Sequence, residues 1–333
     1  MNIGELEFVE PVFLAPMAGV TDRAFRIIAR KMGCPLCCAE MVSAQGIHYH
    51  NAKTLTMLDT SPEERPLSLQ LFGRSPEILS EAAAYVESLH TADILDFNMG
   101  CPAPKIVNNG EGAALMREPK LVADILRALR RATKLPLTVK IRKGWDDAHI
   151  NATEIARIAE AAGVDAVTVH GRTRQEFYGG RADWDIVARV KRAVKIPVVL
   201  SGDVRSAKDY LRARATTGAD GVMIGRAAQG NPWIFRDIIR HLRDEPPLAV
   251  SLTERGKIMR EHLALLVKFK GEYIGIREMR KHAAWYTHGL TGGAALRLAV
   301  NQAKTCADFY RLIDKLTAGI TEGVTEGGNF VGQ

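Results

Sequence analysis

The sequence contains no uninterrupted apolar run of the ~18 residues that a membrane-spanning helix needs. Its first ten residues carry three glutamates, whereas a secretory signal peptide begins with a basic segment followed by an apolar one. The 5 cysteines form an odd set without the spacing of a disulfide framework. These absences predict a cytoplasmic protein with reduced thiols and no membrane association.

Two ligand-binding motifs are also missing. No Gly-x-Gly-x-x-Gly sequence follows a predicted strand, so we expect no resident dinucleotide site of the Rossmann type. The Cys-x-x-Cys pair Cys34 and Cys37, with Cys38 beside it, has no second pair at metal-ligand spacing. We therefore expect no metal site and interpret these three cysteines as structural or incidental thiols.

The composition is that of a folded globular protein, with 47% hydrophobic and 25% charged residues. At 333 residues, the chain exceeds the ~250 residues of a typical α/β barrel. We therefore expect one large domain and a smaller one. The net charge of +7 suggests an anionic partner, and nucleic acid is the first candidate.

Short apolar runs alternate with helical stretches over the first two thirds of the chain. The runs are 12–15, 36–41, 67–71, 94–97, 137–141, 166–169, 198–200 and 221–224. The helical stretches are 21–31, 76–89, 119–132, 152–161, 184–193 and 207–215. This alternation predicts parallel βαβ units of an α/β protein. Eight strands is the number that closes a TIM (β/α)8 barrel, although a doubly wound sheet is the alternative.

A barrel would place its active site in the loops that follow the strands. Polar or reactive residues, or residues with special backbone properties, occur at seven of these eight positions. They are Pro16, Met17 and Ala18; Gln70; Cys101; Lys140 with Arg142; His170 with Arg172; Gly202 and Asp203; and Gly225 and Arg226. This coincidence is the main support that the residues alone give to a barrel with an active site.

Cys101 stands between Gly100 and Pro102, outside the apolar periodicity in which packing cysteines usually occur. It could be a reactive thiol or simply a free thiol beside a turn. Lys140 interrupts an apolar strand, where an ammonium is unfavourable unless it faces a polar mouth or an anion. It could hold an electron-rich cofactor, form a Schiff base, or extend to water from the strand end. His170 could be an ordinary strand-end histidine, but its place before Gly171 favours ligand binding.

The loops after the seventh and eighth strands bind phosphate through backbone amides in many TIM barrels. Gly202 and Gly225 would let a phosphate approach the backbone, and Arg226 would add a fixed charge. Two ordinary turns with a solvated arginine are the alternative. We favour phosphate binding.

Beyond residue 245 the pattern is helical only. Glu245-Pro246-Pro247 reads as a linker, and Ser251 with Glu254 resembles a capping box. Helices are expected over 254–270, 274–287 and 294–316, with a break at Thr291-Gly292-Gly293 and with Cys306 in the core. This pattern predicts a bundle of three or four helices.

Between residues 255 and 281, 8 Lys or Arg accompany 3 Glu. The aromatic residues Phe269, Tyr273, Trp285 and Tyr286 lie in or just after this segment. Basic residues interleaved with aromatic ones suit an RNA backbone and unstacked bases. A solvated helix face over an aromatic core would give the same pattern. The Gly-rich segment 318–333 is expected to be a flexible tail.

Taken together, these motifs resemble the tRNA-dihydrouridine synthase family, and within it the bacterial B-type subgroup. The resemblance runs from Ala15 to about Tyr286. Its motifs, in order, are APMAGVTD (15–22), QLFG (70–73), NMGCP (98–102), VKIR (139–142), HGRT (170–173), GDV (202–204) and GVMIGRA (221–227), with GNPW (230–233) after the last. Seven motifs in order are specific, whereas any one alone would be weak.

The resemblance implies an FMN-binding TIM-barrel catalytic domain over 1–244, a helical tRNA-recognition domain over 245–317, and the tail over 318–333. It implies that the protein reduces specific uridines in tRNA to 5,6-dihydrouridine, with NADPH as the electron source. Nothing in the sequence requires a dimer, so we expect a monomer.

The resemblance also assigns roles to individual residues. Hydride from reduced FMN would reach C6 of uracil, and Cys101 would be the general acid that protonates C5. The expected FMN contacts are Pro16, Met17, Ala18, Gln70, Lys140, His170, Ser201, Gly202, Asp203, Gly225 and Arg226. The expected tRNA contacts are Asn98, Arg142, Arg172, Arg280 and Lys281. Ser201 departs from the family, which usually has a longer Asn there.

Two other functions are compatible with the same residues. A flavin-dependent enzyme that reduces free pyrimidines would share the chemistry, but its basic helical region would have no purpose. A non-catalytic barrel that only binds tRNA would not need Cys101, Lys140 or Arg226.

Overall fold

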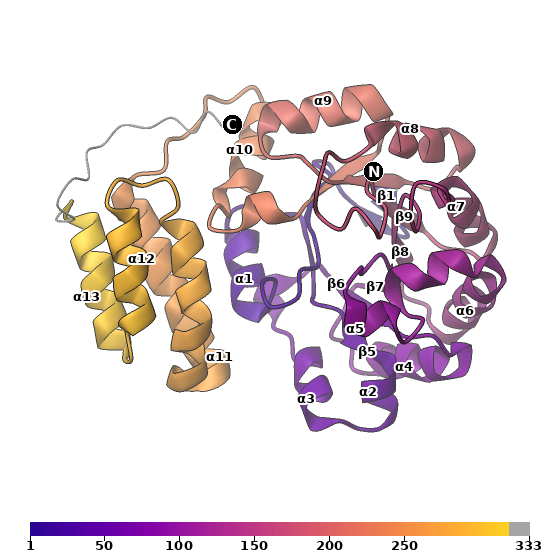
Figure 1. Ribbon diagram of the computed structural model, residues 1–333, viewed down its shortest axis with the longest axis horizontal. Helices are drawn as coiled ribbons and strands as arrows, with labels where there is room; N and C mark the ends of the chain where they lie inside the picture. The colour runs from indigo at the N-terminus through magenta and orange to yellow at the C-terminus, as the bar shows by residue number, and fades with distance from the viewer. Residues whose placement is uncertain (320–333) are drawn as a thin grey trace. The chain divides into compact units, whose positions relative to one another are not determined.

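The computed structural model describes residues 1–319, and its first unit is a closed barrel of parallel strands (Figure 1). The barrel strands are β3 (Val12–Leu14), β4 (Leu36–Cys38), β6 (Leu67–Phe72), β7 (Ile94–Met99), β8 (Leu137–Arg142), β9 (Ala166–His170), β10 (Val198–Ser201) and β11 (Gly221–Ile224). The pairing of β11 with β3 closes the ring, and the short β5 (Val42–Ser43) pairs in parallel with the carboxyl end of β6. All eight predicted strands are confirmed, and the doubly wound alternative is wrong.

Helices on the outside of the barrel connect successive strands. They are α1 (Arg23–Lys31), α4 (Pro76–Ser88), α6 (Pro119–Ala132), α7 (Ala152–Ala161), α8 (Trp184–Ala193) and α9 (Ala207–Thr217), followed by α10 (Trp233–Leu242), which was not predicted. Asp22, Ser75, Asp183 and Ser206 cap four of these helices by accepting backbone N–H hydrogen bonds. The short helices α2 (Ala44–His48), α3 (Ala52–Leu55) and α5 (Pro104–Val107) and the 3-10 turn η3 (Gly112–Arg117) lie in loops.

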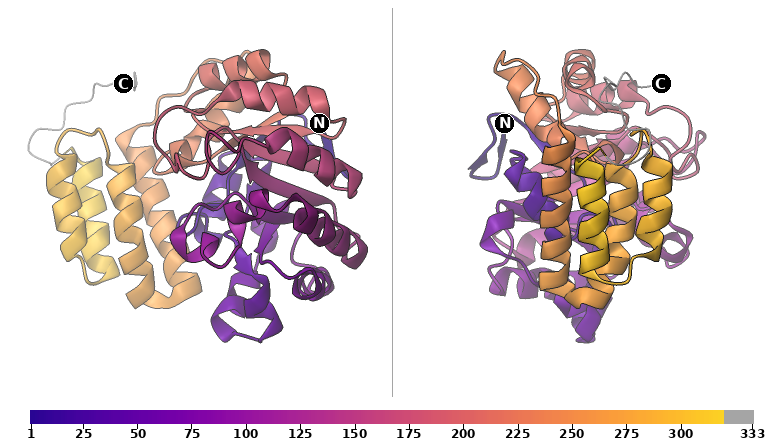
Figure 2. Two further views of the ribbon diagram at one scale, coloured as in Figure 1. Left: turned by 45° about the vertical axis from the view of Figure 1, so that its right-hand side comes forward. Right: turned by 90° about the vertical axis from the view of Figure 1, so that its left-hand side faces the viewer.

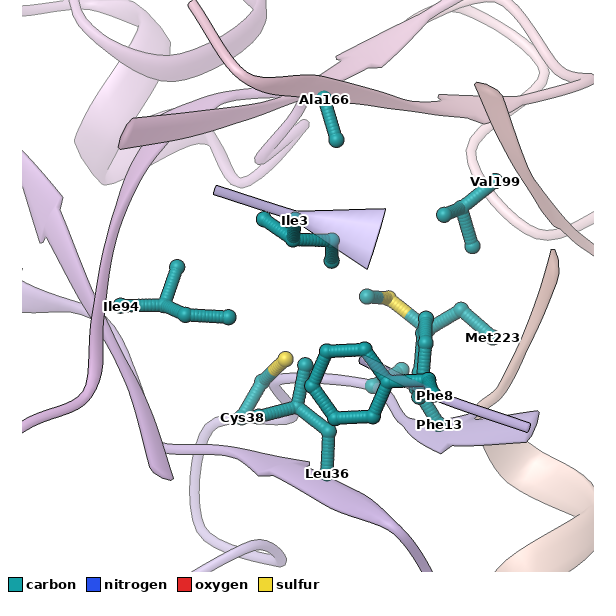
Figure 3. Close-up of a cluster of buried hydrophobic side chains, with 10 residues drawn as sticks. Ile3, Phe8, Phe13, Leu36, Cys38, Ile94, Ala166, Val199 and Met223 are labelled. Atoms are coloured by element: carbon teal, nitrogen blue, oxygen red, sulfur yellow. The ribbon is translucent and has the colours of Figure 1, made fainter. Parts of the chain in front are cut away.

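An N-terminal hairpin closes one end of the barrel. Strands β1 (Asn2–Ile3) and β2 (Leu6–Glu7) pair antiparallel, and Ile3 and Phe8 lie among inward-pointing side chains from six barrel strands (Figure 3). Those side chains are Phe13, Leu36, Ile94, Ala166, Val199 and Met223. The Phe8 and Phe13 rings meet edge to face, with centroids 5.0 Å apart. Because this apolar plug seals the amino-terminal ends of the strands, the polar residues gather at their carboxyl ends.

The second unit is helical. It consists of residues 228–233 and the chain from Pro246 onward, whereas the barrel unit comprises Met1–Ala227 and Ile234–Glu245. Its helices are α11 (Leu252–Tyr286), α12 (Gly293–Gln302) and α13 (Cys306–Thr317), which run side by side (Figure 2). Gly271, with φ of 77°, breaks α11 into the two helices that the sequence predicts there. The part of the predicted tail from residue 320 on lies outside the described residues.

The prediction of one helix over 294–316 is wrong, because Ala303 leaves the helical conformation and a new helix begins after Thr305. Thr305 and Asp308 form a capping box at that start. Cys306 consequently lies in the first turn of α13, where it is half-buried rather than in the core. Its backbone N–H donates to Glu272 at 2.8 Å. In the part of the chain that the structure describes, no helix is long and apolar enough to cross a membrane.

Candidate active site

Polar side chains line the mouth of the barrel. Residues in a strand alternate between the barrel interior and the outer helices, so every second residue points inward. Asp96 and Asn98 follow Ile94 of the apolar layer by two and four positions, so they also point inward. The strand register places Asn98 opposite Lys140, and Gln70 opposite Asp96. Residues predicted separately on β6, β7 and β8 therefore lie together at the carboxyl ends of neighbouring strands.

The loop that carries Cys101 is held from three directions. The side-chain oxygen of Asn98 accepts hydrogen bonds from the backbone N–H groups of Gly100 at 3.1 Å and Cys101 at 2.9 Å. Arg142 donates from Nε to the Gly100 carbonyl at 2.8 Å, and Ala113 N–H donates to the Cys101 carbonyl at 3.0 Å. The thiol therefore sits on a fixed backbone although it lies in a loop.

The half-buried Cys101 thiol is a candidate proton donor. Burial raises its pKa, which keeps the sulfur protonated at neutral pH. A hydrogen bond from the Ala103 backbone and the positive charges of Arg142 and Lys140 act in the opposite direction, because they favour the thiolate. These cations would stabilise the anion left after a proton is given away.

The ammonium of Lys140 lies inside the barrel mouth without a direct ion pair to any described residue. Burial and the neighbouring charge of Arg142 lower its pKa to about 8, while Asp96 opposes this shift. Within residues 1–319, no hydrogen bond or ion pair within contact distance reaches its ammonium. An electron-rich group bound in the mouth would supply the missing partner.

His170 is buried at the end of β9, opposite Arg142 in the register. Burial, together with the charges of Lys140, Arg142 and Arg172, holds its pKa well below the ordinary value. Its imidazole is therefore neutral at physiological pH and can serve as a hydrogen-bonding group rather than as a cation.

The loop after β10 is a tight turn that carries the charged side chain of Asp203. Gly202 has φ of +118°, and a Cβ there would lie 2.8 Å from that of Ala182 and 3.0 Å from the His170 ring. Asp203 follows at φ of +57° and accepts from Arg172 at 2.8 Å and from the Ala182 amide at 2.6 Å. Burial raises the pKa of Asp203, but these two donors outweigh it and lower the pKa.

Arg226, two residues after the end of β11, borders this turn. Its side chain is 50% exposed and lies 3.6 Å from Asp203. A Cβ at Gly225 would meet only Ala15 and the Met17 sulfur, each at 3.8 Å, so the backbone there is open. The Ala15 amide donates to the Ile224 carbonyl at 2.9 Å, which joins the first loop to the last. Pro16, Met17 and Ala18 therefore lie beside Gly225 and Arg226, while Ser201 lies opposite His170.

Arg142 and Arg172 are almost fully buried, and their guanidinium groups brace the loop after β9. Arg142 donates to the carbonyls of Thr173 and Phe177, each at 2.7 Å. Arg172 donates to the carbonyls of Gly179 at 2.7 Å and Gly180 at 2.8 Å. Both arginines therefore shape the mouth, and their direct contact with substrate stays a prediction.

Arg280 and Lys281 belong to the helical unit, so the structure does not join them to the barrel site. Arg280 donates to the Ala303 carbonyl at 2.7 Å and thereby ties α11 to the turn before α13. Lys281 is half-buried next to it on α11.

Three features of the mouth were not predicted from the sequence. Tyr178 is exposed between two cations, with its ring centroid 5.6 Å from the Arg142 guanidinium and 5.4 Å from that of Arg226. The guanidinium groups of Arg117 and Arg174 likewise lie over the Trp145 ring, 4.9 Å and 4.8 Å from its centroid. The third is Asp96, whose charge inside an apolar strand was the available signal. The aromatic residues gave none, since loop aromatics have no periodicity.

Cys34, Cys37 and Cys38 are buried, and burial raises the pKa of the Cys37 and Cys38 thiols well above the ordinary value. Among the described residues, no group of three or more His, Cys, Asp or Glu side chains is arranged to hold a metal ion.

Comparison with known proteins gives a consistent result. The family model for dihydrouridine synthase (Dus) matches residues 13–320. A tRNA-dihydrouridine synthase B from Pseudomonas aeruginosa is 43% identical over 91% of this chain and 91% of its own length. Proteins of the same name from Xanthomonas axonopodis pv. citri and Shewanella oneidensis are 40% and 42% identical, over 98% and 94% of this chain and 99% and 97% of their own. A solved FabK structure from Thermotoga maritima is only remotely similar, with 16% identity over 67% of this chain and 63% of its own, and a TM-score of 0.41.

Proposed function

This chain belongs to the dihydrouridine synthase family, and from that premise we propose that it reduces specific uridines in tRNA to 5,6-dihydrouridine, with FMN as its cofactor and NADPH as the reductant. The observation that carries the proposal is the protonated thiol of Cys101, fixed on a loop beside the unpaired ammonium of Lys140. A proton donor next to a site for an electron-rich group suits the reduction of a polarised double bond.

The residues of the mouth fit FMN. Lys140 would face the electron-rich isoalloxazine edge, with Gln70 and the loop of Pro16, Met17 and Ala18 around the ring. The side-chain-free backbone at Gly202 and Gly225 would let a phosphate approach, and the half-exposed Arg226 would pair with its charge. Asp203, held by Arg172, would fix the turn, and Ser201 and His170 would offer further hydrogen bonds.

The chain's own contribution to the reaction is positioning and proton transfer. When bound, FMN supplies the hydride that reduces uracil at C6. Cys101 gives its Sγ proton to C5, which forms the new C–H bond, and the thiolate regains a proton from solvent. Arg142 and Lys140 favour that thiolate electrostatically. Asn98, Arg142 and Arg172 would orient the base, which must leave the RNA stack to reach the mouth.

We assign tRNA recognition to the helical unit and catalysis to the barrel. The excess of Lys and Arg over Glu between residues 255 and 281, including Arg280 and Lys281, suits phosphate contacts along an RNA backbone. NADPH would act as a visiting reductant, because the sequence carries no Rossmann motif.

The test is to incubate purified, FMN-loaded protein with NADPH and either unmodified tRNA or free uridine. The product is followed by mass spectrometry as a gain of two hydrogens, mapped along the tRNA. We expect dihydrouridine in tRNA and none from free uridine. Equal activity on free uridine would favour the free-pyrimidine reductase, and tRNA binding without reduction would favour the non-catalytic barrel.

A further inference from the structure

A chain of hydrogen bonds runs from the barrel interior to the Cys101 loop. The buried carboxylate of Asp96 accepts from Thr138 Oγ1 and from Gln70 Nε2, each at 2.6 Å. The Gln70 oxygen accepts from Asn98 Nδ2 at 2.7 Å. The Asn98 oxygen in turn accepts the Gly100 and Cys101 amides.

The carboxylate of Asp96 sets the order of donors and acceptors along this whole series of hydrogen bonds. An ionised carboxylate offers only acceptors, so Gln70 must turn its NH2 group toward Asp96. The Gln70 oxygen then faces Asn98, which must present its own NH2 group there. The Asn98 oxygen is left facing the loop, where it finds two N–H donors. Burial raises the pKa of Asp96, whereas the hydrogen bonds from Thr138 and Gln70 and the nearby charge of Lys140 oppose this shift and favour the ionised form on which the order depends.

We propose that Asp96 is a positioning residue for Cys101, because its carboxylate orients the Gln70 and Asn98 amides and thereby holds the catalytic loop. Asp96 touches neither substrate nor cofactor in this role, and it acts through the two amides. The inference rests on the proposed function of Cys101 as the proton donor. It extends that function to a residue that lies deep in the barrel, two positions before Asn98 on β7.

The decisive variant is Asp96→Asn, which has nearly the same shape. If its oxygen keeps the Thr138 hydroxyl, an NH2 group faces Gln70 and inverts that side chain. Asn98 is then inverted as well, so its NH2 group faces the two loop amides, which lose their acceptor. We expect hydrogen exchange at Gly100 and Cys101 to be about tenfold faster, measured by mass spectrometry on the peptide that contains them.

Two further variants separate orientation from packing. Thr138→Val removes a hydrogen bond from Asp96 without reversing the chain, so loop exchange should stay within about twofold of the wild type. The swap Asp96→Asn with Asn98→Asp conserves composition and charge. In this double variant, the oxygen of Gln70 accepts from the amide at position 96, and its NH2 group donates to the carboxylate at position 98. That carboxylate also accepts the hydrogen bonds of the two loop amides. Exchange should return to within about threefold of the wild type.

Unchanged loop exchange in Asp96→Asn would overturn the proposal, and so would a Thr138→Val variant that exchanges as fast as Asp96→Asn. If Asp96→Asn alone does not fold, the double variant is the test. A double variant that fails to fold, or that folds but exchanges its loop amides as fast as an unprotected loop, would contradict the proposed order of hydrogen bonds. Exchange requires no turnover. A wild-type protein that protects the loop as described but leaves tRNA unchanged would therefore reject the proposed function and leave this inference standing.

Discussion

At the scale of single residues, the proposed roles of Cys101 and Lys140 separate catalysis from binding. Its thiol is held on a fixed backbone, protonated by burial and flanked by the cations that would stabilise its conjugate base. Lys140 complements it as the unpaired charge to which a cofactor can bind. Substitution of Cys101 should change the reaction rate, whereas the charge of Lys140 should change cofactor affinity with pH, so the two roles can be tested separately.

Cys101→Ala should keep bound flavin and its reduction by NADPH, because the thiol is not needed for either. The rate of dihydrouridine formation should fall by roughly 10²-fold or more, since a positioned general acid contributes about that much. Product per tRNA under single-turnover conditions is the measurement. Cys306→Ala, at a half-buried cysteine of the helical unit, is the matched control and should retain the wild-type rate. Undiminished turnover in Cys101→Ala would reject the proton-donor role.

The affinity for FMN should weaken as the pH rises through about 8. The pKa of Lys140 is lowered to about 8, so the ammonium is present below that pH and is lost above it. If binding requires the charge, affinity should decrease by about tenfold per pH unit well above the pKa. Titration of FMN at pH 7, 8 and 9 measures this, with Lys140→Arg as the variant that keeps its charge. A wild-type affinity that is flat over this range would contradict the role of Lys140.

The sequence identified most of these residues but not their partners. Lys140 and Cys101 stand out locally, one by its charge in an apolar strand and the other by its Gly–Pro neighbours. The bonds of Arg142 to the carbonyls of Thr173 and Phe177 cross from β8 to the loop after β9, and no spacing rule encodes them. The chain from Asp96 through Gln70 to Asn98 likewise joins β7 with β6, so it requires the strand register.

At the scale of elements, the strand-to-helix loops hold the candidate site, and the turn after β10 is constrained by the positive φ of Gly202 and Asp203. Gly202→Ala should reduce the free energy of unfolding by about 2 kcal/mol, because the positive φ and the contact with Ala182 both oppose a side chain. Gly225→Ala is the comparison, since the side chains nearest to its Cβ position, those of Ala15 and Met17, lie 3.8 Å away. It should change stability by less than about 0.5 kcal/mol.

Urea unfolding of the two glycine variants measures this difference. Equal stability of Gly202→Ala and Gly225→Ala would contradict the described geometry of the turn. FMN affinity, titrated on the same samples, should fall for both. The Gly225 methyl group would occupy backbone space assigned to the phosphate, and the Gly202 methyl group would displace the turn proposed to hold it.

The strands were predictable because those of a parallel barrel are buried on both faces and appear as short apolar runs between turn residues. The division of 294–316 into α12 and α13 was missed because its signal is a single capping box at Thr305 and Asp308, inside an otherwise helical pattern. The hairpin β1–β2 gives little sequence signal, since each strand has two residues and depends on the barrel for its packing.

At the scale of the whole molecule, the two units have separate proposed tasks, and each can be impaired without the other. Lys281→Ala should weaken tRNA binding a few-fold and reduce the slope of log Kd against log salt by about 1, because one phosphate contact is lost. Reduction of bound FMN by NADPH should be unchanged. The control is Lys134→Ala, at an exposed lysine just before β8, at the closed end of the barrel. An unchanged salt slope in Lys281→Ala would argue against a phosphate contact at this residue.

The central claim, that this barrel transfers reducing equivalents from NADPH to uridine in tRNA, can be tested in one anaerobic experiment. Protein reduced with one equivalent of NADPH is mixed with tRNA that lacks dihydrouridine, and absorbance near 450 nm is followed as product is quantified. We predict that the oxidised flavin absorbance returns as dihydrouridine forms, one for one. If the protein stays reduced in the presence of tRNA, or is reoxidised without dihydrouridine, the account is contradicted.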